Sequence, residues 1–515
     1  MDPQNASGEH RDRAGVEKTK PRARFGRKSQ GRYELVIVGS GRAAICASRE
    51  AARLGVRAAL VVEEPWAYRR ESDAWFLRQV LRRIAGLAHQ LVAGPFHTDP
   101  PLAIGWPDFA AVMAWVRATR EQIAAGPLIP CDKELPHPRD ARQLPQAGAE
   151  VLTGQAVFTG RDTLEVDTRQ LRFRRAIVAT GARQMKTEIE GGEQIECLTS
   201  KTLVELSELP QRLAVIGTGP VSCQLAQSFC RLGSRVYLIG PSANILPGVE
   251  PEAAAVVQSR LVKEAVCLKL GCEHLAVEQT GNLLTVVIGR EGRKEKLFVD
   301  KVLLEERAEP NTAGLGLETA GVAYTDRGVV ISDRLQTTNR RIFAAGAICG
   351  NEFSSLEAAE ATARLALDNC LQRNRRKLNR RLLCRCVYTE PEIAQFGLSP
   401  TEASAEGNEI QTYRAELGQT VAAVLPGGED GFAVVHLRRR TGRVVGATIV
   451  SEEAGALISP LALLASRNLP LAALADVIPC RAGRFDLLRR MAECHAARTS
   501  PPRGLALKLH AWWNK

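Results

Sequence analysis

Apolar residues recur along the chain in short runs that end in glycine, and helical patterns follow these runs. One apolar run, residues 33–38 (YELVIV), leads into Gly39 and is followed by a helical pattern that reaches Leu54. A second run, residues 58–62, comes next and ends at Glu63. The order of strand, glycine turn, helix and strand predicts a β-α-β unit of a parallel sheet.

The same pattern returns near the middle of the chain. Residues 212–216 form an apolar run into Gly217, a helical pattern reaches Leu232, and residues 236–239 form the next apolar run. Two β-α-β units predict two α/β domains with parallel sheets. Residues 386–490 instead carry alternating strands and two apolar helices, so we expect a separate α+β unit at the C-terminal end.

The glycines after the first strand have the spacing that binds a dinucleotide. In Gly39-Ser40-Gly41-x-x-Ala44, the first glycine permits a tight turn, the second lets the backbone approach a pyrophosphate, and the alanine lets helix and strand pack closely. The N-terminus of the helix attracts the phosphate charge. Because Glu63 stands at the end of the second strand, where an acid bonds a ribose, we predict a nucleotide site here.

The second copy, Gly217-x-Gly219-x-x-Ser222, indicates the fold more clearly than the ligand. Its second strand runs into Gly240-Pro241-Ser242, which offers neither a carboxylate for a ribose nor a cation cluster for a 2′-phosphate. A working nucleotide site and a structural relic of one are both compatible with this pattern.

Charge is concentrated in two segments. Residues 1–32 hold nine Lys and Arg against four Asp and Glu, and residues 373–385 hold seven basic residues and no acid; together they account for the net charge of +12. Such clusters bind nucleic acid in some proteins, but a solvated tail and linker is the simpler interpretation, so we do not expect a nucleic-acid partner. No apolar stretch is long enough to predict a membrane span.

The 13 cysteines are scattered mostly one at a time, which is typical of reduced thiols in a cytoplasmic protein. Cys267 and Cys272 have the spacing of a redox pair but lie inside the second unit, where we expect coincidence. Cys384-x-Cys386 lacks the further ligands that a metal site needs, so no metal is expected. Cys494 and His495 are adjacent on a predicted helix, so they point apart and do not form a catalytic pair.

The order of these motifs resembles the pyridine nucleotide-disulfide oxidoreductases, specifically the dihydrolipoamide dehydrogenase, glutathione reductase and mercuric reductase group. The resemblance spans residues 33–490 and rests on several segments together. It implies FAD on the first glycine fingerprint and leaves room for NAD(P)H on the second. The implied cofactor-binding residues are Gly39, Ser40, Gly41, Ala44, Glu63, Thr180, Gly181, Gly346 and Ala347 for FAD, with Gly217 and Gly219 for NAD(P).

The resemblance also implies a fold and a division of the chain. The fold class is α/β, with two Rossmann-like dinucleotide-binding domains of the FAD and NAD(P) types and a C-terminal α+β dimerisation domain. In chain order we expect a disordered basic tail at 1–32, the FAD-binding domain at 33–205 and 330–372, the NAD(P)-type domain at 206–329, a basic linker at 373–385, the dimerisation domain at 386–495 and a tail at 496–515.

The chain departs from the family at the residues that carry its chemistry. No cysteine lies between Cys46 and Cys131, where the family has its redox pair. The family's His-Pro-x-x-x-Glu motif falls on Arg481-Ala482 and Asp486, and the Asp that bonds the flavin's ribityl chain is Ala347. Gln224 replaces the Glu that follows the NAD(P) fingerprint, and Glu305-Glu306-Arg307 replaces a late Ala-Thr-Gly segment.

Two functions remain open at this stage, and no catalytic residue is assigned. In one, the chain is an FAD-binding oxidoreductase without disulfide reductase chemistry, which passes electrons from NAD(P)H to oxygen, a quinone or a metal. In the other, it is a catalytically inactive relative that serves as a binding or structural dimer.

A homodimer through residues 386–490 is expected in either case. The apolar positions of this region are more than a small domain needs for its own core, and an uncovered apolar surface is rare on monomers. The alternative is that all of them pack inside the domain. These positions are Leu457, Ile458, Leu461, Leu463, Leu464, Leu469, Leu471 and Leu474.

Overall fold

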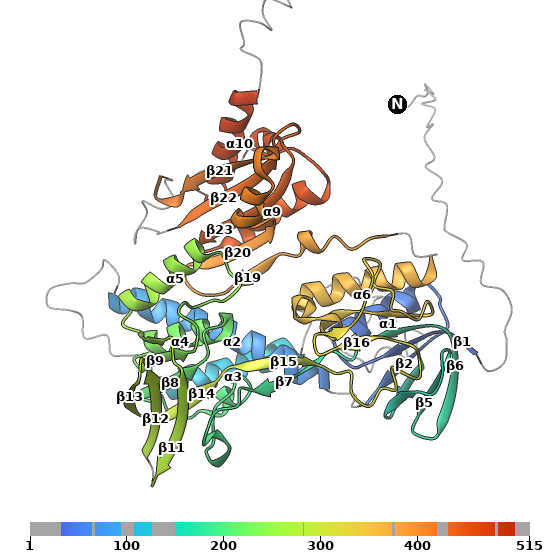
Figure 1. Cartoon of the computed structure of the whole chain (residues 1–515), viewed down its shortest axis with the longest axis horizontal. Helices are drawn as coiled ribbons and strands as arrows, with labels where there is room; N and C mark the ends of the chain where they lie inside the picture. The colour runs from blue at the N-terminus through green and yellow to red at the C-terminus, as the bar shows by residue number, and fades with distance from the viewer. Residues whose placement is uncertain are drawn as a thin grey trace, which may run out of the picture.

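The computed structural model describes most of the chain, and Figure 1 shows how its parts are arranged. The described residues are 32–63, 67–93, 108–125, 150–281, 283–372, 376–419, 431–478 and 483–499. Residues 1–31 of the predicted tail at 1–32, residues 500–515 of the predicted tail at 496–515, and residues 373–375 of the predicted basic linker lie outside them.

The first α/β unit is built on a seven-stranded sheet within the described residues, in the order β3-β2-β1-β6-β5-β4, with β18 also pairing β6. Strands β1, β2, β3, β6 and β18 pair in parallel, so their carboxyl ends meet at one edge. Helices α1 (Arg42–Arg53) and α6 (Leu356–Leu371) contact each other, and their apolar residues share a core with β1 and β2. The strands are β1 (Arg32–Val38), β2 (Ala58–Val62), β3 (Glu150–Thr153), β4 (Ala156–Phe158), β5 (Thr163–Val166), β6 (Arg169–Val178) and β18 (Ile342–Ala344).

The second α/β unit repeats the same local order around a smaller parallel sheet, β10-β9-β8-β14. The sheet is joined to the first unit by the antiparallel pair β7 and β15. A three-stranded antiparallel sheet, β11-β12-β13, shares a core with β8 and β14. The elements are β7 (Ala182–Lys186), β8 (Arg212–Ile216), α4 (Pro220–Arg231), β9 (Arg235–Gly240), α5 (Pro251–Lys263), β10 (Cys267–Leu270), β11 (His274–Thr280), β12 (Leu283–Arg290), β13 (Arg293–Val299), β14 (Lys301–Leu304) and β15 (Glu306–Pro310). The following pair, β16 (Tyr324–Thr325) and β17 (Gly328–Val329), packs on the first unit, where Val329 shares a core with β1 and β6.

The C-terminal unit is an antiparallel sheet in the order β19-β20-β23-β22-β21, and α9 packs against it. This confirms the fold class predicted from the sequence: two Rossmann-like units followed by an α+β unit. The elements are β19 (Arg385–Val387), β20 (Glu392–Gly397), α7 (Pro400–Ala405), β21 (Ile410–Glu416), β22 (Phe432–Arg438), β23 (Val444–Ser451), α9 (Ala454–Ser466) and α10 (Asp486–Thr499).

The burial of the C-terminal apolar residues does not support the argument that they are more than their own domain needs for its core. Six of the eight positions are buried within the single chain, most of them between α9 and the sheet, as the alternative interpretation holds. Leu463 and Leu469 are the two that stay exposed, at 58% and 42%. Any apolar interface on this unit therefore has to use a smaller set of residues. The six buried residues are Leu457, Ile458, Leu461, Leu464, Leu471 and Leu474.

Helices α2 (Ala67–Ala93) and α3 (Phe109–Ala125) lie within the span 33–205 that we expected to form the first domain, but they pack against the second unit. Leu81 of α2 and Met113 of α3 share one apolar core with Phe229 of α4 and with Phe432 of the C-terminal sheet. In Figure 1 the two helices lie beside α4. The exact domain boundaries stay a prediction.

Within the part of the chain that the structure describes, none of the helices combines the length and the apolar character that crossing a membrane requires.

Candidate dinucleotide sites

The first glycine loop lies between β1 and α1, at the carboxyl edge of the parallel strands. Gly39 has φ +134°, and a Cβ built on it would lie 2.2 Å from the carbonyl oxygen of Ala179, so only glycine fits this turn. A Cβ built on Gly41 would meet no heavy atom of the described residues within 4 Å. The space in front of Gly41 is therefore open, as the approach of a pyrophosphate requires.

Helix α1 begins at this open space without an acceptor of its own. Gly41 is the N-cap, no side chain caps the helix, and its first turn contains no acid. The first backbone N–H groups of a helix have no partner inside the helix, and the helix dipole places partial positive charge there. The start of α1 thus has the donors and the field that bind an anion.

Other residues that the sequence assigned to FAD lie at the same edge. Thr180 and Gly181 follow β6, where the Thr180 hydroxyl donates to the Asn311 carbonyl oxygen at 2.9 Å and the Asn311 amide returns a bond to Thr180 at 2.9 Å. Gly346 follows β18, and a Cβ built on it would lie 3.1 Å from that of Ala43 in α1. Since β1, β6 and β18 are parallel neighbours, the fold brings these loops together.

Two further predicted residues lie beside these loops. Ala347 is half-buried in the turn that follows Gly346, and Glu63 is exposed directly after β2. Because β2 pairs in parallel with β1, Glu63 leaves the sheet at the same edge as Gly39. Residues 39–63 and the loops after β6 and β18 therefore fit a dinucleotide in composition and in position. The individual ligand roles stay predictions.

The second glycine loop has the same backbone and a different neighbour. Gly217 has φ +132°, and Gly219 is the N-cap of α4. A Cβ built on Gly219 would lie 1.9 Å from Oε1 of Glu305, and one built on Gly217 would lie 2.2 Å from Oε2 of the same carboxyl group. The space that is open at Gly41 is thus filled at Gly219.

Glu305 makes hydrogen bonds to this loop from the end of β14. The Gly219 N–H donates to Oε2 of Glu305 over a long distance of 3.4 Å. Burial raises the pKa of Glu305, and the backbone N–H groups of Gly219 and Thr218 oppose the rise. Burial and the neighbouring Glu305 charge also raise the pKa of the Cys223 thiol in the first turn of α4. The loop thus already holds a carboxylate.

Sequence reasoning missed the position of this carboxylate. It noted that Glu305 replaces the first residue of a family Ala-Thr-Gly segment, but not where the side chain lies. One signal in the sequence could have located it, namely an acid directly after the apolar run 302–304. This run lies in β14, which pairs in parallel with β8, so the acid leaves the sheet at the same edge as the glycine loop that follows β8.

The described cysteines form no redox pair beside the first loop. Helix α2, the next described element after β2, contains no cysteine. Cys267 is the first residue of β10 and Cys272 lies two residues after the end of that strand, and both are free thiols. Among the described residues, no group of His, Cys, Asp and Glu is arranged to hold a metal ion.

The C-terminal acid-base motif is also changed in structure. Asp486, at the start of α10, accepts hydrogen bonds from Arg489 at 2.9 Å and from Arg490 at 2.7 Å, and the Arg489 bond holds its pKa below the usual range. A carboxylate held ionised in this way is a poor proton donor at neutral pH. Arg481 and Ala482 lie outside the described residues.

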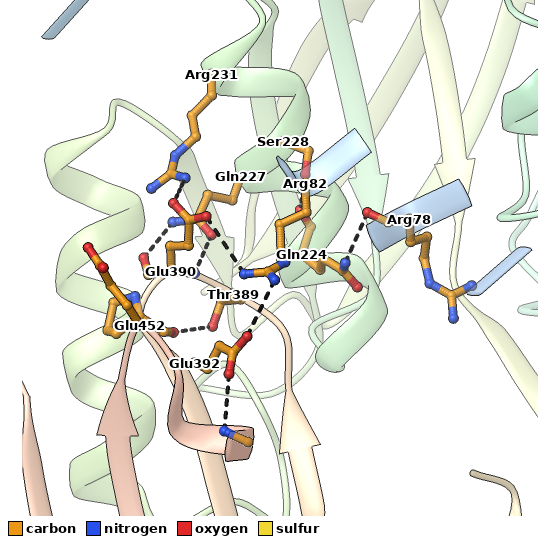
Figure 2. Close-up of polar contacts among 12 residues, drawn as sticks. Arg78, Arg82, Gln224, Gln227, Ser228, Arg231, Thr389, Glu390, Glu392 and Glu452 are labelled. Carbon is orange, nitrogen blue, oxygen red and sulfur yellow. Dashed lines mark hydrogen bonds and ion pairs between the residues drawn. The ribbon is translucent and has the colours of Figure 1, made fainter. Parts of the chain in front are cut away.

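A buried ion cluster lies where helix α2, the second α/β unit and the C-terminal sheet meet (Figure 2). Arg231 of α4 is almost fully buried, pairs with Glu264 at 2.7 Å and forms a second ion pair with Glu390. Arg82 of α2 reaches Glu390 at 3.7 Å and Glu392 at 3.4 Å. The cluster therefore links α2, the second unit and the C-terminal sheet, and each buried charge has an opposite partner.

One residue of this junction bears on the second site. Gln224, which stands where the family has a glutamate after the fingerprint, donates from Nε2 to the backbone oxygen of Arg78 in α2 at 3.2 Å (Figure 2). Its amide is thus engaged in holding α2 to α4.

Comparisons with known proteins agree with this architecture. Residues 33–363 match the family model described as pyridine nucleotide-disulphide oxidoreductase, and residues 383–481 match the dimerisation domain of that family. The chain is 30% identical to a mercuric reductase of Staphylococcus aureus, over 87% of this chain and 79% of the relative. It is 31% identical to a dihydrolipoyl dehydrogenase of Thermus scotoductus, over 61% of this chain and 68% of the relative.

Solved structures support the fold. The crystal structure of LpdA from Mycobacterium tuberculosis superimposes with a TM-score of 0.75 at 22% identity, and covers 90% of this chain and 99% of its own. The flavoprotein disulfide reductase RclA from Escherichia coli gives a TM-score of 0.72 at 21% identity, with the same coverage.

Proposed function

Because the chain belongs to the pyridine nucleotide-disulphide oxidoreductase family, we propose that it is an FAD-binding flavoprotein without the disulfide reductase chemistry of its relatives. The observation that carries the proposal is the first glycine loop, which keeps its turn at Gly39 and its open space at Gly41. A backbone that must approach a pyrophosphate needs both features.

Each part of the first site has a distinct task in this proposal. Gly41 and the start of α1 hold the pyrophosphate, and Glu63 accepts from a ribose hydroxyl. FAD, when bound, supplies the redox chemistry itself. The surrounding loops position the flavin part and exclude water from it; these are the residues Gly39, Ser40, Ala44, Thr180, Gly181, Gly346 and Ala347.

The proposed loss of disulfide chemistry is supported by the lack of a thiol pair and of a base at the positions where the family has them. Electron transfer from flavin to a disulfide needs a proximal thiol pair, and exchange with the substrate needs a base that generates a thiolate. Helix α2 has no cysteine, and Asp486 is paired with Arg489 and Arg490. Electrons from a bound flavin would therefore pass to an acceptor such as oxygen, a quinone or a metal.

The C-terminal unit supports a homodimer. Residues 383–481 match a dimerisation domain, and the exposed Leu463 and Leu469 lie within that range. Association through one self-complementary patch is the usual way to form such a dimer.

A catalytically inactive FAD-holding dimer is the second candidate, and the filled second glycine loop favours it. The two candidates differ in whether the bound flavin, once chemically reduced, passes its electrons to an added quinone faster than free flavin does. Accelerated transfer supports the oxidoreductase, and equal rates support the inactive dimer.

The test of the first site is the visible absorption spectrum of the full chain after incubation with FAD and removal of unbound flavin. We expect a bound flavin. Gly41→Asp should abolish it without harming the fold, because aspartate at an N-cap favours the helix but repels phosphate. Gly418→Asp is the control, since that exposed glycine also has open space around it. A colourless wild-type protein after this treatment would refute FAD binding. Reduction of lipoamide or glutathione disulfide by NADH or NADPH at ordinary turnover would refute the loss of disulfide chemistry.

A further inference from the structure

The two glycine loops of this chain have nearly the same backbone conformation. Gly39 and Gly217, the first glycines, have φ of +134° and +132°. Gly41 and Gly219, the N-caps of the following helices, have φ and ψ of −80° and −177° in the first loop and −75° and 178° in the second. A difference in ligand binding between the loops therefore cannot come from the path of the backbone.

The difference lies in what faces the second glycine. Nothing in the described residues lies within 4 Å of a Cβ built on Gly41, whereas Oε1 of Glu305 would be 1.9 Å from a Cβ built on Gly219. The Gly219 N–H is directed at Oε2 of Glu305. Since a dinucleotide pyrophosphate uses these same backbone donors at a helix start, the carboxylate stands in the place of a phosphate.

The backbone of Glu305 is fixed in this position. Its N–H donates to the Ile216 carbonyl at 2.8 Å, and its carbonyl accepts from the Thr187 hydroxyl at 2.7 Å. Its Cβ would be 2.4 Å from a Cβ built on Gly217, so the side chain starts directly over the loop. Rotation can move the carboxylate, but the Cβ stays over the glycine.

The charge of the Glu305 carboxylate, like the position of its side chain, opposes the binding of a dinucleotide to this loop. A dinucleotide pyrophosphate is anionic at neutral pH, and like charges within a few ångströms repel each other strongly where water is partly excluded. The ribose end offers no compensation, because β9 ends at Gly240 and the residues that follow, Pro241 and Ser242, carry no carboxylate.

We propose that Glu305 is an internal occupant of the pyrophosphate position and closes the second unit to NADH and NADPH. The family scaffold is kept there, and its anion site is filled by the chain's own carboxylate. Electrons would then reach a flavin in the first unit from a donor other than a nicotinamide bound in the second. The closure does not depend on whether FAD is bound.

The test is binding of NADH and of NADPH to the full chain, measured by nucleotide fluorescence and by calorimetry. The wild-type protein should show no saturable binding up to about 1 mM, and Glu305→Ala should bind at least one of the two at least about tenfold more tightly. Glu306→Ala is the matched control, because that neighbouring carboxylate accepts from the Ser200 N–H at 3.1 Å and is not among the atoms that face the glycines.

Circular dichroism of each variant establishes that the fold is kept, and the visible spectrum reports FAD separately. Micromolar binding of NADH or NADPH by the wild-type chain would overturn the proposal. So would a folded Glu305→Ala protein that binds no better than wild type, or an equal gain in Glu306→Ala. A protein that lacks FAD but shows the Glu305→Ala gain refutes the proposed cofactor and supports the closure.

Discussion

At the scale of single residues, one carboxylate distinguishes the two nucleotide-type loops. Glu305 lies against Gly217 and Gly219, where burial raises its pKa. A carboxyl group with a raised pKa is costly to keep ionised in the folded state. Ionisation of Glu305 as the pH rises therefore costs stability, and this cost can be measured.

The first prediction concerns Glu305→Gln and its pH dependence. The folded-state pKa of Glu305 lies above the ordinary value of 4.5, so stability is present in full below that value and is lost as pH rises through the folded-state pKa. Glutamine still accepts from the Gly219 N–H but carries no charge. The melting temperature of the variant should match wild type near pH 4.5 and exceed it near neutral pH.

Asp300→Asn is a control of opposite sign. The hydrogen bond from Arg212, at 2.7 Å, lowers the pKa of Asp300, so its contribution to stability is present at neutral pH and is lost as pH falls through the folded-state pKa. That variant should melt below wild type near neutral pH, with a gap that closes in acid. A Glu305→Gln protein that also melts below wild type near neutral pH would contradict the account of Glu305.

At the scale of elements, helices in equivalent positions of the two α/β units differ in what lies at their N-termini. Helices α1 and α4 both follow a parallel strand and begin at a glycine N-cap, but only α1 begins at open space. Helix α9 covers the C-terminal sheet with four leucine or isoleucine side chains and leaves Leu463 outside. Leu463 and Leu469 are thus two exposed leucines in the region that matches a dimerisation domain.

The second prediction is that Leu463 and Leu469 contribute to a homodimer. Wild-type protein at micromolar concentration should sediment at about twice the single-chain mass of 56.0 kDa. The double variant Leu463→Glu/Leu469→Glu should shift toward the single-chain mass, because a buried unpaired charge is costly. Leu283→Glu, at a leucine of β12 that is 39% exposed and outside that domain, should stay dimeric. A single-chain mass for wild type would exclude the homodimer.

At the scale of the whole molecule, the apolar cores do not follow the order of the chain. One core joins α2 and α3, which precede β3, to α4 and to the inner face of the C-terminal sheet. The first unit has separate cores on the two faces of its sheet. The ion cluster around Arg231 lies at the same junction as the core that joins α2, α3, α4 and the C-terminal sheet (Figure 2). We therefore expect the second unit and the C-terminal sheet to share stability.

The third prediction tests this coupling. Phe229 is fully buried in the shared core, 6.3 Å between ring centroids from Phe109, and Phe173 is fully buried in the first unit beside Phe158. Replacing either phenylalanine by alanine should cost about 3–5 kcal/mol locally. Hydrogen exchange should increase in α2, α4 and β22 for Phe229→Ala, and in β1, β5 and β6 for Phe173→Ala.

Increased exchange confined to α4 in the Phe229→Ala protein would contradict the shared core. A uniform increase in exchange over the described chain in both variants would also contradict the prediction, because the two cores would then not be separate cooperative units.

The first glycine site was largely predictable from the sequence because its signals are local. The turn at Gly39, the helix that follows and the strand that ends before Glu63 are adjacent in the chain, and each follows from periodicity and glycine geometry. The loops at Thr180 and Gly346 were identified only through the family resemblance. Their position beside Gly39 depends on which strands pair with β1.

The sequence alone therefore determined the two β-α-β units, the family resemblance and the lack of any cysteine between Cys46 and Cys131, because each depends on the identity of residues close together in the chain. The tertiary structure decided which side chains fill the spaces between elements. The parallel pairing of Leu304 with Ile216 puts Glu305 over the glycines of a loop more than eighty residues earlier. Packing of α9 on its sheet likewise buries four apolar residues that the sequence assigned to an interface, and Leu471 and Leu474 are buried in the same core. Both outcomes depend on pairing between distant segments, which local periodicity does not specify.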